Sequence, residues 1–478
     1  MKRFWIAILS LGLATALSMP AFGASMDFGG SFRIRGWYND NQTLRPDNLA
    51  GAGHTSFFEQ RLRAIGRIPL ADGVRINTRF DALEASWATP RTPFTANDTP
   101  NSRTDAENIQ WEIVNMEFKT PIGNFLAGSS QAPLTWGTKF FASSEGVRYL
   151  IRYTKPVGPF EVRATWEKKA ESQRWASAAR DNNDGDGDIY ALAAKYKGKN
   201  YETGIQWQYL LDNSAKAGAA SATTGFSKRL HNLMPYYIGK FGNISLQATG
   251  LYIFGDAKKY DDLAGAPAGV IDVDARGWGG YLNARYTTGP TYLGVEVSYT
   301  SGDDPTTPDK QEGFFAANFD GASSQSGSSG PKPTLMTQNT TFNRFFGNFI
   351  GALNDGPAAT RSDRSSNGFS NLQGANNDNS FQYSLYGGYA FTPKWDIYSM
   401  LLINRAAETP NNRDGSARFI SDDISKELDV VLNYKITGQL TYSVQAAYWW
   451  TGDYFKGTNP NAQVDNTYVL MHVLDLSF

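Results

Sequence analysis

The chain has 478 residues and no cysteine, which excludes disulfide frameworks, thiolate zinc sites and iron–sulfur clusters. Its 45 basic and 46 acidic residues give a formal net charge of −1, without the basic excess of a nucleic-acid-binding protein. A soluble chain of this length would normally hold about two or three domains, yet no shift in composition marks a boundary.

The first residues resemble a secretory signal peptide. Lys2 and Arg3 precede an apolar stretch at 4–17, and Ala21-Phe22-Gly23 forms a small-x-small cleavage site. The apolar stretch is shorter than the roughly 20 residues that a spanning helix needs. We therefore predict a signal peptide over 1–23 and one mature domain over 24–478. Removing the two basic residues, in a segment without acids, changes the net charge from −1 to −3.

From residue 26 onward, apolar and polar side chains alternate in segments of roughly ten residues, the length that a tilted strand needs to cross a bilayer. In 26–38, Phe32 and Ile34 share one face and Arg33 and Arg35 share the other. The pattern predicts eighteen strands, with sixteen as the alternative, and in 228–254 it does not decide which face is apolar. The strands fall near 26–38, 56–68, 74–87, 108–119, 124–130, 145–154, 160–169, 187–198, 201–211, 228–240, 243–254, 274–287, 291–301, 379–391, 394–405, 426–437, 440–450 and 466–478.

Short and long connections alternate between these strands. Turn-like sequences such as 69–73 and 288–290 alternate with long polar stretches, the longest at about 302–378. Tight periplasmic turns, long extracellular loops and an even strand number are typical of bacterial outer-membrane barrels. We therefore predict an all-β fold: a transmembrane antiparallel β-barrel of about 18 strands in the outer membrane of a Gram-negative bacterium.

The last strand supports this fold. Leu474, Leu476 and the terminal Phe478 alternate with Asp475 and Ser477. We expect this strand to close the barrel against 26–38 and to be recognised by the barrel-assembly machinery. Outer-membrane lipid and lipopolysaccharide would surround the apolar face. His472 has the lipid-facing parity, for which a bulge or an interfacial position is the expected reason.

A series of arginines has the parity of the lumen face. Guanidinium groups bind carboxylates and phosphates through paired donors, so this series predicts a pore that favours small anionic or sugar-like solutes. The alternative is that the arginines solvate the lumen and pair with acids such as Glu59, Asp81 and Glu112. The predicted pore-lining residues are Arg33, Arg35, Arg61, Arg63, Arg75, Arg79, Arg148, Arg152, Arg163 and Arg285, with Glu427 and Asp429 as the acidic side.

Two long loops are candidate constrictions. Aromatic residues interrupt the polar 302–378 loop, so part of it either folds into the pore or forms an adhesive surface patch. A shorter loop at 131–144 carries Trp136 and is the second candidate.

Other chemistry has weaker support. Asp184, Asp186 and Asp188 alternate with glycines as in a calcium loop, but Ala193 stands where the bidentate glutamate should be, and a solvated acidic loop is the other interpretation. No other cofactor is expected. The three histidines lack the spacing of a catalytic triad, and neither HExxH nor GxSxG occurs. We predict that the protein is not an enzyme.

Four short motifs resemble the alginate-export-type outer-membrane porins. They are Ser301-Gly302-Asp303-Asp304-Pro305, Glu427-Leu428-Asp429, Gln60-Arg61-Leu62-Arg63 and Trp450-Thr451-Gly452-Asp453-Tyr454-Phe455. This resemblance implies an eighteen-strand monomeric barrel whose arginine-rich lumen conducts anionic uronate polymers or other small solutes. The short periplasmic turns depart from an exporter in that group whose long periplasmic loop plugs its pore.

The function expected from the sequence is a passive porin for small hydrophilic solutes with a preference for anions. One alternative is an export channel for an acidic, alginate-like exopolysaccharide. A second alternative is a structural barrel that encloses an electron-transfer partner. Any haem would then belong to that partner, because the chain has no CxxCH.

Overall fold

A computed structural model of the chain describes residues 26–41, 44, 53–87, 109–131, 136–138, 147–171, 185–216, 225–260, 263, 270–304, 306–313, 335–336, 379–409 and 418–478. The predicted signal peptide, Asp184 and most of the 302–378 loop lie outside these residues. No helix in the described ranges is both long enough and apolar enough to span a membrane.

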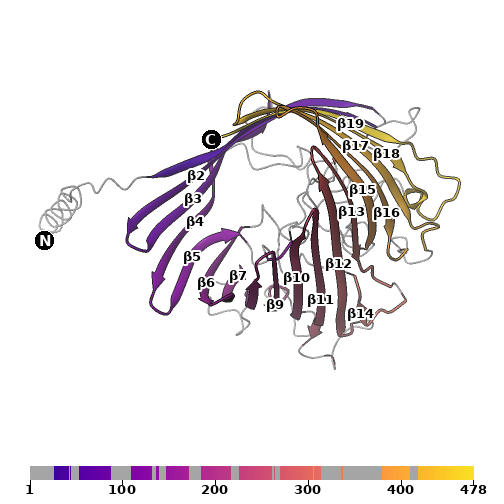
Figure 1. Cartoon of the computed structure of the whole chain (residues 1–478). Coiled ribbons are helices and arrows are strands. Elements are labelled where there is room, and N and C mark those ends of the chain that lie inside the picture. The colour runs from indigo at the N-terminus through magenta and orange to yellow at the C-terminus, as the bar shows by residue number, and fades with distance from the viewer. Residues whose placement is uncertain are drawn as a thin grey trace, which may run out of the picture.

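Eighteen long strands of the described residues pair antiparallel in chain order and close into a barrel (Figure 1). This confirms the predicted fold, and the two-residue β14 only pairs in parallel with β12. The strands are β1 (Asp27–Asp40), β2 (Thr55–Ala71), β3 (Val74–Ser86), β4 (Ile109–Thr120), β5 (Gly123–Gln131), β6 (Val147–Val157), β7 (Phe160–Ala170), β8 (Gly187–Lys197), β9 (Tyr201–Asp212), β10 (Phe226–Phe241), β11 (Ile244–Tyr260), β12 (Val273–Thr288), β13 (Thr291–Thr300), β14 (Lys310–Gln311), β15 (Ser380–Ala390), β16 (Trp395–Ala406), β17 (Asp423–Lys435), β18 (Leu440–Thr451) and β19 (Thr467–Ser477).

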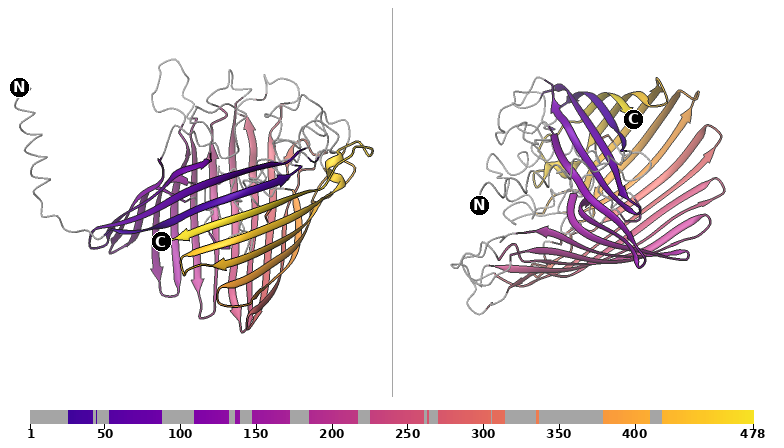
Figure 2. Two further views of the ribbon diagram at one scale, coloured as in Figure 1. Left: turned by 90° about the horizontal axis from the view of Figure 1, so that it is seen from above. Right: turned by 90° about the vertical axis from the view of Figure 1, so that its left-hand side faces the viewer.

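The first and last strands close the barrel, as the sequence predicted. β1 pairs with β19 from Ser31 opposite Ser477 to Asp40 opposite Tyr468 (Figure 2, left). Beyond that ladder, the Gly30 N–H donates to the Phe478 carbonyl oxygen at 2.8 Å, and the Phe478 N–H donates to the Gly30 oxygen at 3.0 Å. Every long strand therefore has two neighbours, and no free sheet edge is left to face lipid.

The connections alternate as predicted between a short-turn end and a long-loop end. β2 joins β3 through Asp72 and Gly73, and β12 joins β13 through Gly289 and Pro290. Gly73 and Gly289 have φ values of 75° and 52°, a region that a residue with a Cβ atom avoids. β1 starts and β19 finishes at the short-turn end, which is why the strand number is even.

The two faces of the wall differ in chemistry. Along β13, Leu293 and Val295 are 58% and 48% exposed on the outside, whereas Glu296 and Ser298 are buried on the lumen side. In β10, where the sequence did not decide the face, Leu230 and Asn232 are buried inward. Inward-folded loop segments cover this part of the lumen, so apolar residues occur on both faces of β10.

His472 faces outward without a bulge. It lies directly opposite Gly36, and neither ladder of β19 shifts register there, so the expected bulge is wrong. The imidazole packs between the rings of Phe58 and Tyr442, at centroid distances of 5.3 and 6.3 Å. A Cβ atom on Gly36 would lie 2.1 Å from His472 Nε2, so the missing side chain makes room for the ring.

Candidate functional site: a charged lumen wall

Five predicted arginines come together on β1, β2 and β3 and form what we call the arginine wall: Arg33, Arg35, Arg61, Arg63 and Arg79. Strand register explains the grouping, because Arg33 lies opposite Arg61 and Arg63 lies opposite Asp81. Side chains opposite each other on one face of an antiparallel pair lie about 5 Å apart at Cβ.

Carboxylates are interleaved with the arginine wall. Arg63 binds Asp81 through two hydrogen bonds of 2.7 Å and also approaches Glu112 at 3.2 Å. Arg79 Nε lies 2.7 Å from the same Glu112 carboxylate, and Arg35 pairs with Glu59. These contacts fit the alternative in which the lumen arginines pair with acids, and we call this network of pairs the charge lattice.

The lattice still contains more guanidinium groups than carboxylates. The five arginines are interleaved with Glu59, Asp81 and Glu112, and Asp475 lies opposite Arg33 in the β1–β19 ladder. Because the groups lie in a partly water-excluded wall, their mutual field is stronger than it would be in bulk water. The resulting surface is polar, ordered and weakly positive in formal charge.

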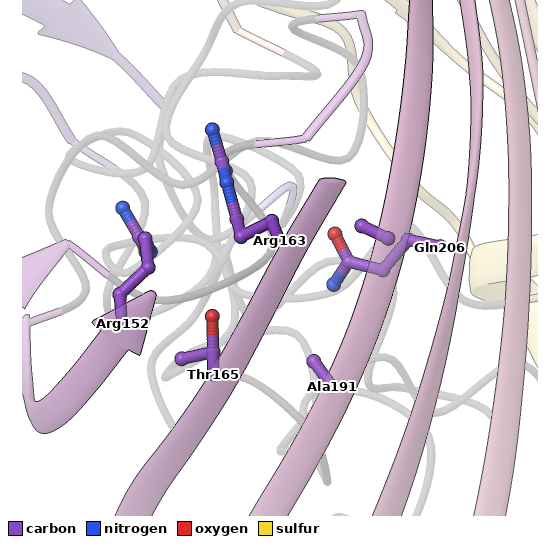
Figure 3. Close-up of a pocket in the computed structure, with 6 residues that line it drawn as sticks. Arg152, Arg163, Thr165, Ala191 and Gln206 are labelled. Atoms are coloured by element: carbon purple, nitrogen blue, oxygen red, sulfur yellow. The ribbon is translucent and has the colours of Figure 1, made fainter. Parts of the chain in front are cut away.

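A second basic group follows on β6 and β7. Arg148 Nε lies 3.6 Å from Glu167, and Arg163 Nη2 lies 3.3 Å from Glu161. Arg152 and Arg163 line a small pocket together with Thr165, Ala191, Ala193 and Gln206. Figure 3 shows the two guanidinium groups on neighbouring strands, with the Gln206 carboxamide turned toward Arg163. In this pocket, two arginines and an amide face a shared space.

Two predicted arginines lie elsewhere. Arg75 pairs with Glu117 near the short-turn end, where both side chains are considerably exposed. Arg285 lies near the short-turn end of β12, with its guanidinium 3.9 Å from the centre of the Tyr292 ring. Neither residue belongs to the arginine wall. Alternation along a strand predicts which face a side chain is on, but it does not predict the height of the residue in the barrel or the side of the barrel on which its strand lies.

The described part of the 131–144 loop lies inside the barrel, as the sequence analysis proposed. The Trp136 ring packs edge-on against Tyr236 at 5.2 Å and lies 5.4 Å from the Arg163 guanidinium. Thr138 Oγ1 and Thr249 Oγ1 are 2.5 Å apart, which ties the segment to β11. The loop therefore contacts β7, β10 and β11 and restrains Arg163.

The described part of the 302–378 loop, Leu335 and Met336, also lies inside the barrel. The Leu335 N–H donates to Asp429 Oδ2 at 3.0 Å, and the Met336 N–H donates to Glu427 Oε1 at 2.7 Å. Glu427 and Asp429 have no exposed surface. These two acids were predicted to line the pore as its acidic side, but the structure places them beneath a loop segment.

Two apolar clusters pack against the other walls of the lumen. One includes Met400, Trp449, Tyr454 and Phe455 and lies mainly along β15–β19. The other includes Trp136, Leu230, Met234, Tyr236 and Ile253 and lies along β8–β12. Nine of the ten predicted pore-lining arginines lie on β1–β7, whereas the two clusters lie mainly along the other strands.

The Ser301–Asp304 motif shapes the start of the longest loop. The Ser301 hydroxyl donates to the Glu312 carbonyl oxygen at 2.6 Å, and the Glu312 N–H donates to Asp303 Oδ1 at 2.7 Å. These bonds return the chain to β12, where β14 pairs. Burial raises the pKa of Asp303, although the Glu312 N–H bond opposes this effect. In the described residues, the motif has a structural role.

The Trp450–Phe455 motif is structural as well. After β18, the Gly452 N–H donates to the Ile424 carbonyl oxygen at 2.9 Å, and a Cβ atom at Gly452 would collide with the Asp423 carbonyl oxygen at 1.9 Å. The chain then turns inward, so that Tyr454 and Phe455 are fully buried.

The predicted calcium residues are only partly described. Lys168 pairs with Asp186 and lies 3.5 Å from Asp188, and the Trp166 indole N–H also donates to Asp188. Among the described residues, no group of three or more acids or histidines is arranged to hold a metal. Calcium binding therefore stays a prediction that also involves Asp184.

The three histidines lie apart, each against aromatic rings. His54 stacks on Tyr38 at 5.4 Å, and His231 stacks on Tyr209 at 4.9 Å. His472 packs against Phe58. No two of the three share a described contact, so the structure brings together no histidine pair that could work as one acid–base site.

Comparisons with known proteins show the fold. No family model and no curated protein matches the chain. OccAB1 of Acinetobacter baumannii has a similar structure, with a TM-score of 0.52 and 12% identity over 95% of this chain and 96% of that one. OccK8 (OprE) of Pseudomonas aeruginosa, with 12% identity, gives a TM-score of 0.48 over 95% and 98% of the two chains. A BenF-like porin of Pseudomonas fluorescens Pf-5, also 12% identical, gives 0.47 over 95% and 99%.

The closed eighteen-strand antiparallel barrel with an apolar exterior is the fold that this chain shares with OccAB1. At this identity the likeness concerns the fold, and it does not extend to the alginate-export type.

Proposed function

We propose that this protein is a passive outer-membrane channel for small hydrophilic solutes that favours anions. The observation that supports this proposal is an asymmetric lumen: two apolar clusters pack along the β8–β12 and β15–β19 walls, whereas the arginine wall lies on β1–β3 and the second basic group lies on β6 and β7. A hydrated solute crosses more easily along a polar wall than past packed apolar side chains. The solute path therefore follows the arginine wall and the Arg152–Arg163 pocket.

We infer the preference for anions from the described residues of the arginine wall, where five guanidinium groups are interleaved with four carboxylates. Pairing orders the guanidinium groups without removing their donors, and a row of such groups offers successive weak sites to a carboxylate or a phosphate. The proposed solutes are small anionic and sugar-like molecules. Outer-membrane lipid is proposed to surround the apolar outer face of the barrel.

The test is the reversal potential of the purified channel in a planar bilayer under a salt gradient. We expect an anion-biased potential that moves toward cation preference in Arg61→Glu and in Arg61→Gln/Arg63→Gln. The glutamine pair avoids adding a third acid beside Asp81 and Glu112. Arg276→Glu is the matched control, because Arg276 is exposed near the long-loop end of β12 and lies away from the arginine wall. If the reversal potential is unchanged in both variants of the arginine wall, these arginines do not determine the ion selectivity.

Export of an acidic exopolysaccharide is the main competing proposal. All eight connections at the short-turn end are short, so none can enter the lumen as a periplasmic plug. Polymer accumulating in the periplasm of a deletion strain would favour export over passive diffusion. Co-purification of a multihaem protein would favour the barrel as a sheath for an electron-transfer partner.

A further inference from the structure

Glu427 and Asp429 are carboxyl groups on the lumen face of β17, two residues apart, and neither has any exposed surface. A buried carboxylate without donors is strongly unfavourable, so the groups that donate to this pair identify its role.

Two of those donors are consecutive backbone amides of the longest loop. Leu335 donates to Asp429 Oδ2 at 3.0 Å and Met336 donates to Glu427 Oε1 at 2.7 Å, across 94 and 91 residues of sequence. Side chains two residues apart on a strand project from the same face, so the pair forms a fork that can grip two successive amides. Bonds from amides to charged groups are stronger than bonds between neutral groups.

Apolar contacts reinforce this grip. Leu335 is 7% exposed and Met336 has no exposed surface, and both belong to the cluster that contains Trp449 and Met400. The loop segment is thus held by its backbone through carboxylates and by its side chains through the apolar lumen wall.

We propose that Glu427 and Asp429 are a loop anchor: they hold residues 335–336 inside the barrel, so that this segment covers the β17 wall of the lumen. The position of residues 335–336 and the contacts that hold them do not depend on the proposed channel function. Only the effect of the loop anchor on conduction rests on that function.

The test uses a single cysteine as a reporter, which is specific because the chain has no other cysteine. In Met336→Cys, the thiol should react slowly with a small water-soluble maleimide, since this position is buried. Adding Glu427→Ala and Asp429→Ala should raise the labelling rate by about tenfold or more, the change that corresponds to losing about one hydrogen bond. Circular dichroism and heat-dependent gel migration would verify that each variant is folded.

Two further variants sharpen the test. Glu427→Gln/Asp429→Asn keeps a carbonyl oxygen at each position and should keep the thiol protected. Glu117→Ala removes a lumen carboxylate that pairs with Arg75 and Asn77, and should leave labelling unchanged.

Fast labelling without any anchor substitution would overturn the proposal, as would unchanged labelling in the alanine pair. Labelling of the amide pair as fast as that of the alanine pair would overturn the hydrogen-bonding assignment. Conductance measured on the same preparations separates the two claims. If the protein does not conduct but shows the expected labelling, the loop anchor is supported and the channel function is contradicted. If the protein conducts and labelling is unchanged in the alanine pair, only the loop anchor is contradicted.

Discussion

Arg63 is the centre of the charge lattice at the residue scale. Its guanidinium binds both oxygens of Asp81 and also reaches Glu112, and those two carboxylates are almost fully buried. Arginine suits this position because its planar fork matches a carboxylate, whereas lysine offers a single charged point. The residue therefore affects folding as well as the field in the lumen.

We expect Arg63→Ala to lower the free energy of unfolding by about 3 kcal/mol, because it removes the cation that binds both oxygens of the buried Asp81 and one of the two arginines beside Glu112. Arg75→Ala is the comparison, since Arg75 and Glu117 are considerably exposed and such a pair contributes below about 1 kcal/mol. Denaturant unfolding in detergent, followed by tryptophan fluorescence, measures both. Equal losses in the two variants would contradict the assigned role of Arg63.

At the scale of elements, the seam between β1 and β19 depends on a small residue beneath a ring. Gly36 leaves the space that the His472 imidazole occupies between Phe58 and Tyr442. This packing fills the outer surface of the seam that closes the barrel.

We expect Gly36→Val to destabilise the barrel by about 1–3 kcal/mol through overpacking. His472→Ala should recover part of that loss in the double variant, because it removes the ring that the new side chain meets. Thermal unfolding of the single and double variants measures the coupling. Gly280→Val is the control, since no heavy atom lies within 4 Å of a Cβ atom there.

The inward segment at Trp136 limits the lumen beside β7 and β10. Trp136→Ala removes the ring between Tyr236 and Arg163 and with it one contact of the guanidinium, which still pairs with Glu161. We expect a larger single-channel conductance, with the fold retained because the Thr138–Thr249 contact remains. Bilayer recordings check this, and a conductance equal to the unmodified channel would place the narrowest part of the path elsewhere.

At the scale of the whole molecule, the barrel converts a local alternation into two separate environments. Closure through β1 and β19 separates a mainly apolar outer face from inward side chains that surround a shared lumen. The proposed selectivity would then depend on the summed charge of the lumen rather than on one residue.

Salt should therefore weaken the preference for anions. The Debye length falls from about 10 Å at 0.1 M to about 3 Å at 1 M, which screens a solute from all but the nearest guanidinium groups. For a fixed ratio of salt concentrations across the bilayer, we expect the reversal potential to move toward zero as the absolute concentration rises. A constant potential would indicate selection by direct contacts at a narrow site.

Much of the barrel could be predicted from the sequence because the relevant physics is local. Alternation with a period of two requires only neighbouring residues, and it placed a strand at 291–301 where the structure has Thr291–Thr300. The pairing of Phe478 with the first strand followed from strand count and direction. The arginine wall was accessible for the same reason, because three consecutive strands joined in order place their lumen faces together.

The roles of Glu427, Asp429, Trp136 and Arg285 were decided by tertiary structure alone. Parity gave the face for the strand residues, but the partners of the two acids lie more than 90 residues away in a loop. Arg285 has the parity of the lumen face, but it lies near the short-turn end of β12 and apart from the arginine wall. The height of a residue depends on strand tilt, and its side of the barrel depends on where its strand lies in the ring. The sequence by itself thus determined a closed barrel with an arginine-lined face, because each strand carries its own alternation. Only the tertiary structure decided which walls the inward loop segments cover, because that depends on contacts between distant parts of the chain.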